Sequence, residues 1–317
     1  MPATPVQSFL GGLGLALPVH SLLLLNGKVF GISGFIHRGV KGDREAIAGI
    51  AGLIFGGTIV GLADRAGTAP VFAPFPIVIL SGFLVGLGTK MSNGCTSGHM
   101  ICGLSRLSRR SLAATATFFS VASLTAQLVH AGAHPTPVTF DWSLGASGLS
   151  LLGIQAASLL SLSILYITNK LGNSSERSFL RTVAAFITAV EFAVALRLSN
   201  LTEPTKVLGF LMLPWSAAFD ASLAFLAAGA LPLTTALYRY CRGDEKPRLG
   251  GGWCVPTSQV IDRRLVLGAA AFGMGWGIMG ICPGPGLVNF GRALVARSGV
   301  ATMACWLLSV VVGGLVV

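Results

Sequence analysis

The stretch that decides the fold is residues 92–108, SNGCTSGHMICGLSRLS. Gly, Ser and Cys dominate it, so its composition predicts a break in regular structure. Long apolar runs precede and follow it, and a helix that crosses a bilayer needs about 20 such residues. A broken segment at membrane depth is tolerated only where protein or a water-filled cavity satisfies its backbone. This stretch therefore predicts a re-entrant segment inside a membrane protein.

The whole chain has the composition of a multi-pass membrane protein. Hydrophobic residues make up 53% of its 317 residues and charged residues 10%, whereas soluble domains have about a quarter charged residues. Apolar runs predict nine crossing helices, at 8–26, 45–63, 76–89, 110–131, 146–168, 180–200, 215–238, 264–281 and 299–317. Four shorter runs, near 29–37, 95–107, 205–213 and 284–296, predict re-entrant half-helices. The expected fold class is all-α, with a single transmembrane domain over 1–317 embedded in the lipid bilayer.

The positions of Lys and Arg predict the orientation. Most of the 22 Lys and Arg residues follow odd-numbered crossing helices, among them Arg106, Lys170 and Arg242, and few, such as Arg65, fall on the other side. By the positive-inside rule, we expect the N-terminus outside and the C-terminus inside the plasma membrane. The net charge of +11 is attributed to this orientation and to anionic lipids, and no nucleic-acid partner is expected.

The chain also matches itself in two blocks. A gap-free shift aligns Gly86 with Gly273, Gly88 with Gly275, Cys95 with Cys282, Arg110 with Arg297, Ser111 with Ser298, Ala114 with Ala301 and Thr115 with Thr302. A second block aligns Lys28-Val29-x-Gly31 with Lys206-Val207-x-Gly209. The matches predict repeat one at 8–131, a connecting helix at 146–168 and an inverted repeat two at 180–317. Chance matching in a chain rich in Ala and Gly is the alternative.

The two equivalent cysteines are the main candidates for a binding site. Inverted repeats with broken helices are typical of transporters, whose substrate binds where the broken ends meet. Helix starts offer free N–H groups to an anion, and a thiol is a weak, polarizable donor suited to a sulfur-bearing anion. The expected substrate contacts are Gly94, Cys95, Thr96, Ser97 and Gly98 in one repeat, and Cys282, Gly284 and Gly286 in the other. The alternative is that both cysteines are small core residues.

Further polar residues follow Cys95 or lie at membrane depth. Cys102 either lines the same path or fills the core, and His99 either donates to an anion, relays protons or is structural. Glu191 and Asp220 are acids at membrane depth, for which a coupling proton or a pair with Arg197 is the interpretation. The six cysteines show no C-x-x-C pair and no Cys/His metal spacing. We therefore expect no metal, cofactor or disulfide.

Several motifs together resemble the YeeE/YedE family of sulfur-transport membrane proteins. They are GKVFGISG at 27–34, GCTSGH at 94–99, GLSRLSRRS at 103–111, TKVLGFL at 205–211 and GICPGPGLV at 280–288, and the resemblance covers about residues 10–315. It implies nine crossing and four short helices in an inverted repeat. It also implies that thiosulfate passes between central cysteines, here Cys95 and Cys282, through weak S–H hydrogen bonds.

This chain departs from the family pattern directly after GCTSGH. Small residues are common there, whereas this chain has Met100-Ile101-Cys102-Gly103. The bulkier side chains are expected to narrow the path, and Cys102 adds a thiol.

The expected function is import of thiosulfate or a related sulfur-containing anion, without enzymatic activity. One alternative is a membrane thiol enzyme in which Cys95 or Cys102 attacks a persulfide or disulfide with His99 as its base. Another is a channel for a small neutral solute, with the cysteines as packing. The sequence leaves open whether a soluble sulfur-carrier protein receives the anion on the inner face.

Overall fold

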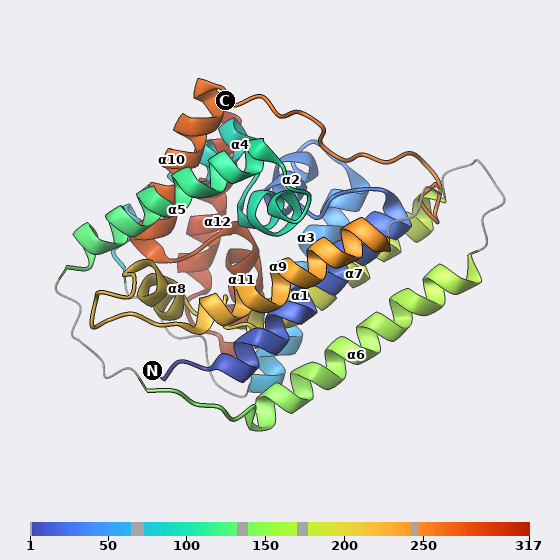
Figure 1. The fold of residues 1–317 in the computed structure, drawn as a ribbon, viewed down its shortest axis with the longest axis horizontal. Helices are drawn as coiled ribbons and strands as arrows, with labels where there is room; N and C mark the ends of the chain where they lie inside the picture. Colours follow the sequence, from blue (N-terminus) through green and yellow to red (C-terminus); the bar gives the residue numbers. More distant parts are fainter. Residues whose placement is uncertain (1, 65–72, 132–138, 170–176, 242–245) are drawn as a thin grey trace.

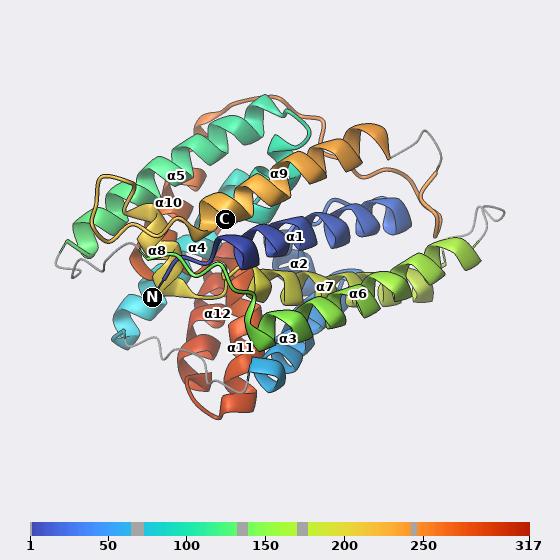
Figure 2. The same ribbon diagram turned by 60° about the horizontal axis from the view of Figure 1, so that its bottom comes forward.

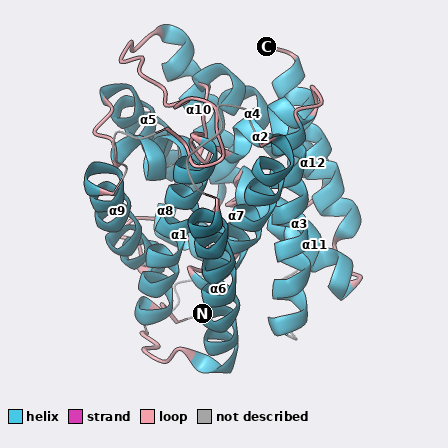
Figure 3. Ribbon diagram, turned by 90° about the vertical axis from the view of Figure 1, so that its right-hand side faces the viewer, coloured by secondary structure: helices cyan, strands magenta, loops and turns pink. Residues whose placement is uncertain are grey.

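The computed structural model describes residues 2–64, 73–131, 139–169, 177–241 and 246–317. In these ranges the chain forms helices and two isolated bridges, without a named strand (Figures 1 and 3). The α-helices are α1 (Pro5–Asn26), α2 (Ile32–Gly39), α3 (Arg44–Asp64), α4 (Phe75–Ser92), α5 (Arg109–Val129), α6 (Gly145–Thr168), α7 (Ser178–Leu198), α8 (Pro204–Leu211), α9 (Ser222–Tyr240), α10 (Arg263–Met279), α11 (Pro283–Ala296) and α12 (Val300–Leu315). A π-helix, η1, spans Ser97–Gly103. Arg65, Lys170 and Arg242, used for the predicted orientation, lie outside the described residues.

Seven described segments are long and apolar enough to cross a membrane. They are α1, α3, α4, α5, Ser147–Thr168 of α6, α7, and a segment from Arg263 to Ala296 that includes both α10 and α11. α12 is apolar but has only 16 residues, and α9 is outside this set. The chain is therefore an all-helical integral membrane protein, and the number of nine crossing helices stays a prediction.

Each predicted segment contains a helix, with one clear shift of boundary. The expected start at 215 is wrong, since α9 begins at Ser222. Leu213 has a positive φ of 67°, and the Asp220 carboxylate accepts a 2.8 Å hydrogen bond from the Ser222 N–H. A left-handed residue and a side-chain acceptor before the first turn are signals that end one helix and start another.

The long helices pack in pairs at very short range. α4 contacts α10 and α12, α10 also contacts α5, α3 contacts α7 and α11, and α1 contacts α9 and α7. Glycines permit this approach: a Cβ at Gly12 of α1 would lie 2.2 Å from the Leu226 oxygen of α9, and one at Gly229 would lie 2.4 Å from the Phe9 oxygen. Small residues at such contacts are typical of helix packing in membranes.

The α3–α7 pair is joined by ion pairs at both ends. Near one end, Arg181 Nε of α7 lies 2.9 Å from Glu45 Oε1 of α3. Near the other end, Arg197 of α7 pairs with Asp64 of α3. By contrast, α6 packs on α7 at the edge of the bundle (Figures 1 and 2) and contributes no charged side chain.

Candidate functional site

The two predicted cysteine segments begin with the same backbone feature. α4 ends at a left-handed cap, Asn93, with φ 59°, and α10 ends at a left-handed cap, Gly280, with φ 68°. In each segment the cysteine follows two residues later. A left-handed residue after the last helical turn is a common helix stop, and Gly and Asn adopt it at low cost. This cap therefore ends each long helix directly before its thiol.

The structure brings the two cysteine segments into contact. The Thr96 hydroxyl donates a hydrogen bond of 3.5 Å to Cys282 Sγ, and Cys95 Sγ lies 3.3 Å from Ser97 Oγ. Ser97 Oγ also accepts a 3.3 Å hydrogen bond from the N–H of Ile32, the first residue of α2. The starts of α2 and α11 and the Cys95 segment therefore meet at one place.

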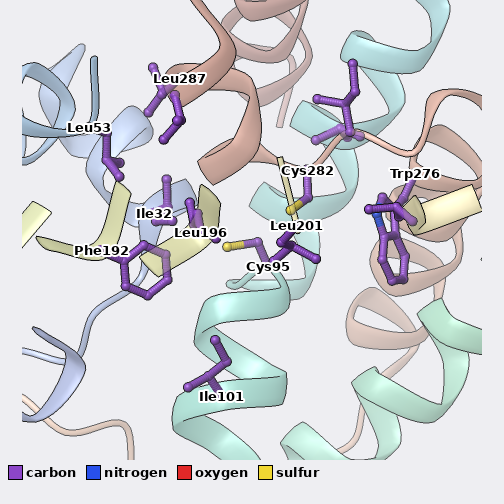
Figure 4. Close-up of a cluster of buried hydrophobic side chains, with 14 of the residues drawn as sticks. Ile32, Leu53, Cys95, Ile101, Phe192, Leu196, Leu201, Trp276, Cys282 and Leu287 are labelled. Atoms are coloured by element: carbon purple, nitrogen blue, oxygen red, sulfur yellow. The ribbon is translucent and has the colours of Figure 1, made fainter. Parts of the chain in front are cut away.

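Both thiols lie in apolar surroundings. Cys95 is 2% exposed and Cys282 3% exposed, and both belong to the main buried cluster. Figure 4 shows the two sulfur atoms directed toward the side of this cluster where Ile32 and Leu196 lie. Among the described residues, all six cysteines are free thiols. The site can therefore offer weak S–H donors and the N–H groups of helix starts in a region from which bulk water is excluded.

The four site glycines differ in the room around them. A Cβ at Gly284 would lie 2.6 Å from Ile32 Cδ1, one at Gly286 2.4 Å from the Trp306 ring, and one at Gly94 2.7 Å from the His99 ring. At Gly98 no atom lies within 4 Å of such a Cβ. Three of them thus allow close packing, and Gly98 borders open space.

His99 is held by other protein groups. Its Nε2 lies 3.2 Å from the Ser92 oxygen and its Nδ1 lies 3.2 Å from Ser111 Oγ. A carbonyl oxygen only accepts, so Nε2 carries the hydrogen, and in a neutral ring Nδ1 accepts from the Ser111 hydroxyl. The structure therefore gives His99 a structural role, and its contact with an anion stays a prediction.

Cys102 belongs to the same buried cluster as the other two thiols and lines a small cavity. Its Sγ donates to the Phe30 oxygen at 3.4 Å. The cavity is lined by Val19, His20, Leu23, Val29, Cys102, Ser105, Arg106, Thr234 and Tyr238. Arg106 donates to the carbonyl oxygens of Cys102 at 2.9 Å and Pro256 at 3.0 Å. The loop after α9, to which the sequence assigns no role, therefore contacts the end of the Cys95 segment.

Sequence reasoning missed a buried charged network at one end of α11. Arg292 Nη1 lies 2.9 Å from Glu203 Oε1, and Arg292 Nη2 lies 3.5 Å from Asp64 Oδ2. Arg197 pairs with the same two acids, so the suggested pair between Glu191 and Arg197 is wrong. The available signal was the position of these charges at the ends of apolar helices.

Comparison with known proteins gives a partial match. No solved structure matches this chain. The model of a family of unknown function, DUF6691, matches residues 180–315, which extend from α7 to α12.

Two relatives from Xylella fastidiosa are each described as "Probable transporter". One, from strain 9a5c, is 47% identical over 112 residues, which are 34% of this chain and 83% of the relative. The other, from strain Temecula1 / ATCC 700964, is 36% identical over 117 residues, which are 37% of this chain and 78% of the relative. These shares mean that each relative is less than half as long as this chain. With its all-helical, apolar fold, the chain belongs to the family of these probable membrane transporters.

Proposed function

We propose that this membrane transporter carries thiosulfate, or a related sulfur-containing anion, along a central path lined by Cys95 and Cys282. The observation that carries the proposal is the contact between the two cysteine segments, in which Thr96 donates to Cys282 Sγ at 3.5 Å. Both thiols are buried beside the starts of α2 and α11. Thiol hydrogens are weak donors, and a site that conducts must also release what it binds.

The charge of the anion is offset by helix starts in this proposal. α11 has Cys282 as its N-cap residue and Pro283 in its first turn, and α2 begins at Ile32, beside Ser97. Free N–H groups and the positive end of the helix dipole favour an anion at such places. The anion is thus held by partial charges, and the thiols stay neutral and form no covalent intermediate.

The inverted repeat is part of the same proposal. It is supported by the equivalent caps Asn93 and Gly280. It is also supported by the helix contacts, because the repeat relates α1 to α7, α3 to α9, α4 to α10 and α5 to α12. The contact between α3 and α7 thus has its equivalent between α9 and α1, and the contact between α4 and α12 has its equivalent between α10 and α5. The repeat is also supported by the family model that matches only the second half, and by the half-length relatives. We propose that the N-terminus faces outside and the C-terminus inside the plasma membrane.

Uptake of radiolabelled thiosulfate into proteoliposomes tests the proposal. We expect the wild type to accumulate the label, and Cys95→Ala and Cys282→Ala each to reduce uptake to background. Cys241→Ala and Cys254→Ala change exposed thiols and serve as matched controls with wild-type uptake. If the double variant Cys95→Ser/Cys282→Ser transports at the wild-type rate, transfer through S–H groups is wrong, since a hydroxyl then serves equally well.

The same proteins separate the two alternatives. A thiol enzyme would accumulate a sulfur adduct on Cys95 or Cys102, which intact-protein mass spectrometry detects. The base that this alternative requires, His99, is already bonded to Ser92 and Ser111. A channel for a neutral solute would show no thiosulfate uptake and no response to either cysteine variant.

A further inference from the structure

Two buried polar side chains at the α6–α7 contact have no hydrogen-bond partner among the described atoms. Glu191 of α7 is 0% exposed, and neither carboxyl oxygen is bonded. Gln155 of α6 is 5% exposed, and neither its oxygen nor its nitrogen is bonded. Buried polar groups are nearly always satisfied, and each exception calls for an explanation.

The two side chains lie on facing surfaces of their helices. Glu191 shares a helical face with Ala184 and Val194, at spacings of seven and three residues, and these pack with Leu162 and Leu151 of α6. On α6, Gln155 shares a face with the same two leucines.

Both residues also lie at the same level along the contact. Asn169, directly after α6, accepts a hydrogen bond from Arg177, directly before α7. Gln155 lies as many residues before Asn169 as Glu191 lies after Arg177, and the two helices run antiparallel. A Cβ at Gly14 of α1 would lie 2.2 Å from Gln155 Nε2, so the amide occupies the space that this glycine leaves.

The helices packed around Glu191 supply no counter-ion. α6 has no charged residue, and α1 has only His20, which lines the cavity at Cys102. The charges of α3 are at its ends, at Arg44, Glu45 and Asp64.

The remaining arginines near α7 are already paired. Arg181 is paired with Glu45, Arg197 with Asp64, and Arg292 of α11 with Glu203. At about 1.5 Å per residue, Arg197 lies about 9 Å from Glu191 along α7. An ionised carboxylate here would be buried and uncompensated, which is strongly unfavourable, so a proton must occupy it.

α7 connects this carboxyl with the proposed path. The next residue, Phe192, stacks on Phe30 with ring centroids 4.4 Å apart, and Leu196 lies beside Cys95 and Cys282 (Figure 4). One helix therefore has the acid on one face and the wall of the cysteine cluster on another.

We propose that Glu191 is a proton-binding site of the transport cycle, with Gln155 as its partner. The two side chains are unbonded in the structure; in the transport cycle a rotamer change brings them together, and the protonated carboxyl donates to Gln155 Oε1. When the proton leaves, the carboxylate accepts from Gln155 Nε2–H. The proton is taken from the outer solution and released to the inner one, so one positive charge accompanies each anion. The proposal rests on the proposed function, and ionisable groups within a membrane commonly form such proton sites.

The first test measures proton movement with transport in proteoliposomes that contain a pH-sensitive dye. An acidic outer solution is expected to raise wild-type thiosulfate uptake several-fold and to move protons inward with the anion. Glu191→Gln imitates the protonated form, so we expect basal uptake without stimulation by the gradient and without proton movement. Asp141→Asn alters an acid in the loop before α6 and serves as the matched control with wild-type behaviour. If Glu191→Gln keeps both the stimulation and the proton movement, the proposal is wrong.

The second test needs no substrate. Infrared spectra of the wild type are expected to show the carbonyl band of a protonated carboxylic acid at neutral pH, and Glu191→Gln should lack it. A wild type with this band but without thiosulfate uptake refutes the proposed function and leaves the proton site standing. If the wild type takes up thiosulfate but Glu191→Gln keeps the carbonyl band unchanged, the proton site is wrong and the proposed function stands. Gln155→Leu, which keeps the acid, is expected to weaken the gradient effect, and wild-type stimulation in this variant also counts against the proposal.

Discussion

The two cysteine segments reach the same place by different physical means. Cys282 begins α11, a regular helix of 14 residues with Pro283 in its first turn. Cys95 precedes η1, a π-helix of seven residues in which Ser97 Oγ accepts from the Ile32 N–H and the His99 ring is bonded to Ser92 and Ser111. π-helical turns are rare and occur often at functional sites. The comparison teaches that the Cys95 segment has its side-chain hydrogen bonds close to the thiol, whereas α11 starts with backbone and tight packing and has its side-chain bonds further along, at Asn289 and Arg292.

The largest expected effect concerns one arginine near each thiol, Arg292 within α11 and Arg106 after η1. Arg292→Met leaves Glu203 and Asp64 buried with one cation fewer, so we expect the free energy of unfolding in detergent to fall by about 3–5 kcal/mol. Among the described residues Arg106 bonds to carbonyl oxygens alone, and Arg106→Met is expected to cost about 0.5–1.5 kcal/mol. Chemical denaturation followed by tryptophan fluorescence measures both. Equal losses of unfolding free energy in Arg292→Met and Arg106→Met would contradict this difference between the two segments.

Next in size is the loss of the imidazole in the Cys95 segment. His99→Ala removes two hydrogen bonds, leaves the buried Ser111 hydroxyl without its ring partner and leaves the Ser92 oxygen with only the long 3.5 Å bond from Arg110, at an expected cost of about 2–4 kcal/mol. Thermal unfolding in detergent is the measurement. Ser111→Ala keeps the ring and its bond to Ser92, so it should cost less. A stability of His99→Ala equal to the wild type would show that η1 does not depend on this side chain.

A smaller effect separates the glycines of the two segments. Gly286→Ala places a methyl group 2.4 Å from the Trp306 ring, so overpacking should cost about 1–3 kcal/mol. Gly98→Ala meets no atom within 4 Å and should change stability by less than about 0.5 kcal/mol. Unfolding midpoints of the two variants, measured side by side, test this. The reverse order would contradict the assignment of close packing to α11 and of open space to Gly98.

The smallest effect is at the contact between the segments. Thr96→Val keeps the shape but removes the hydroxyl that donates to Cys282 Sγ at 3.5 Å. We expect a loss of about 0.5–1 kcal/mol in stability, because the bond is weak. Thiosulfate uptake by the same variant should fall more than its small loss of stability explains, since the contact lies in the proposed path. Unchanged uptake would place Thr96 outside the path.

The sequence predicted the helices well because membrane segments carry strong apolar signals. Each of the four short apolar runs contains a short helix, at α2, η1, α8 and α11. The start of α9 was predicted too early, because Pro214 is the last strong breaker in the sequence, whereas the turn continues through residues 215–219 to Asp220.

The partners of charged and polar groups were less predictable. Nothing in the spacing shows that Arg197 pairs with Asp64 or that His99 bonds to Ser92, because these contacts depend on which helices pack together. Cys95 and Cys282 are buried in one apolar cluster, which fits both the transport path and the alternative of small core residues, and their part in transport stays a prediction.

The ion pairs between α3 and α7 have a mechanical consequence. Glu45 and Asp64 are about 28 Å apart along α3, and each is paired with an arginine of α7. Sliding α3 along α7 would break both pairs, so this movement is opposed at both ends of the contact. Between α1 and α9, whose residues are all described, glycines form the contact and no ion pair joins them. Electrostatics therefore opposes relative movement of α3 and α7 at both ends of their contact, whereas only packing opposes it between α1 and α9.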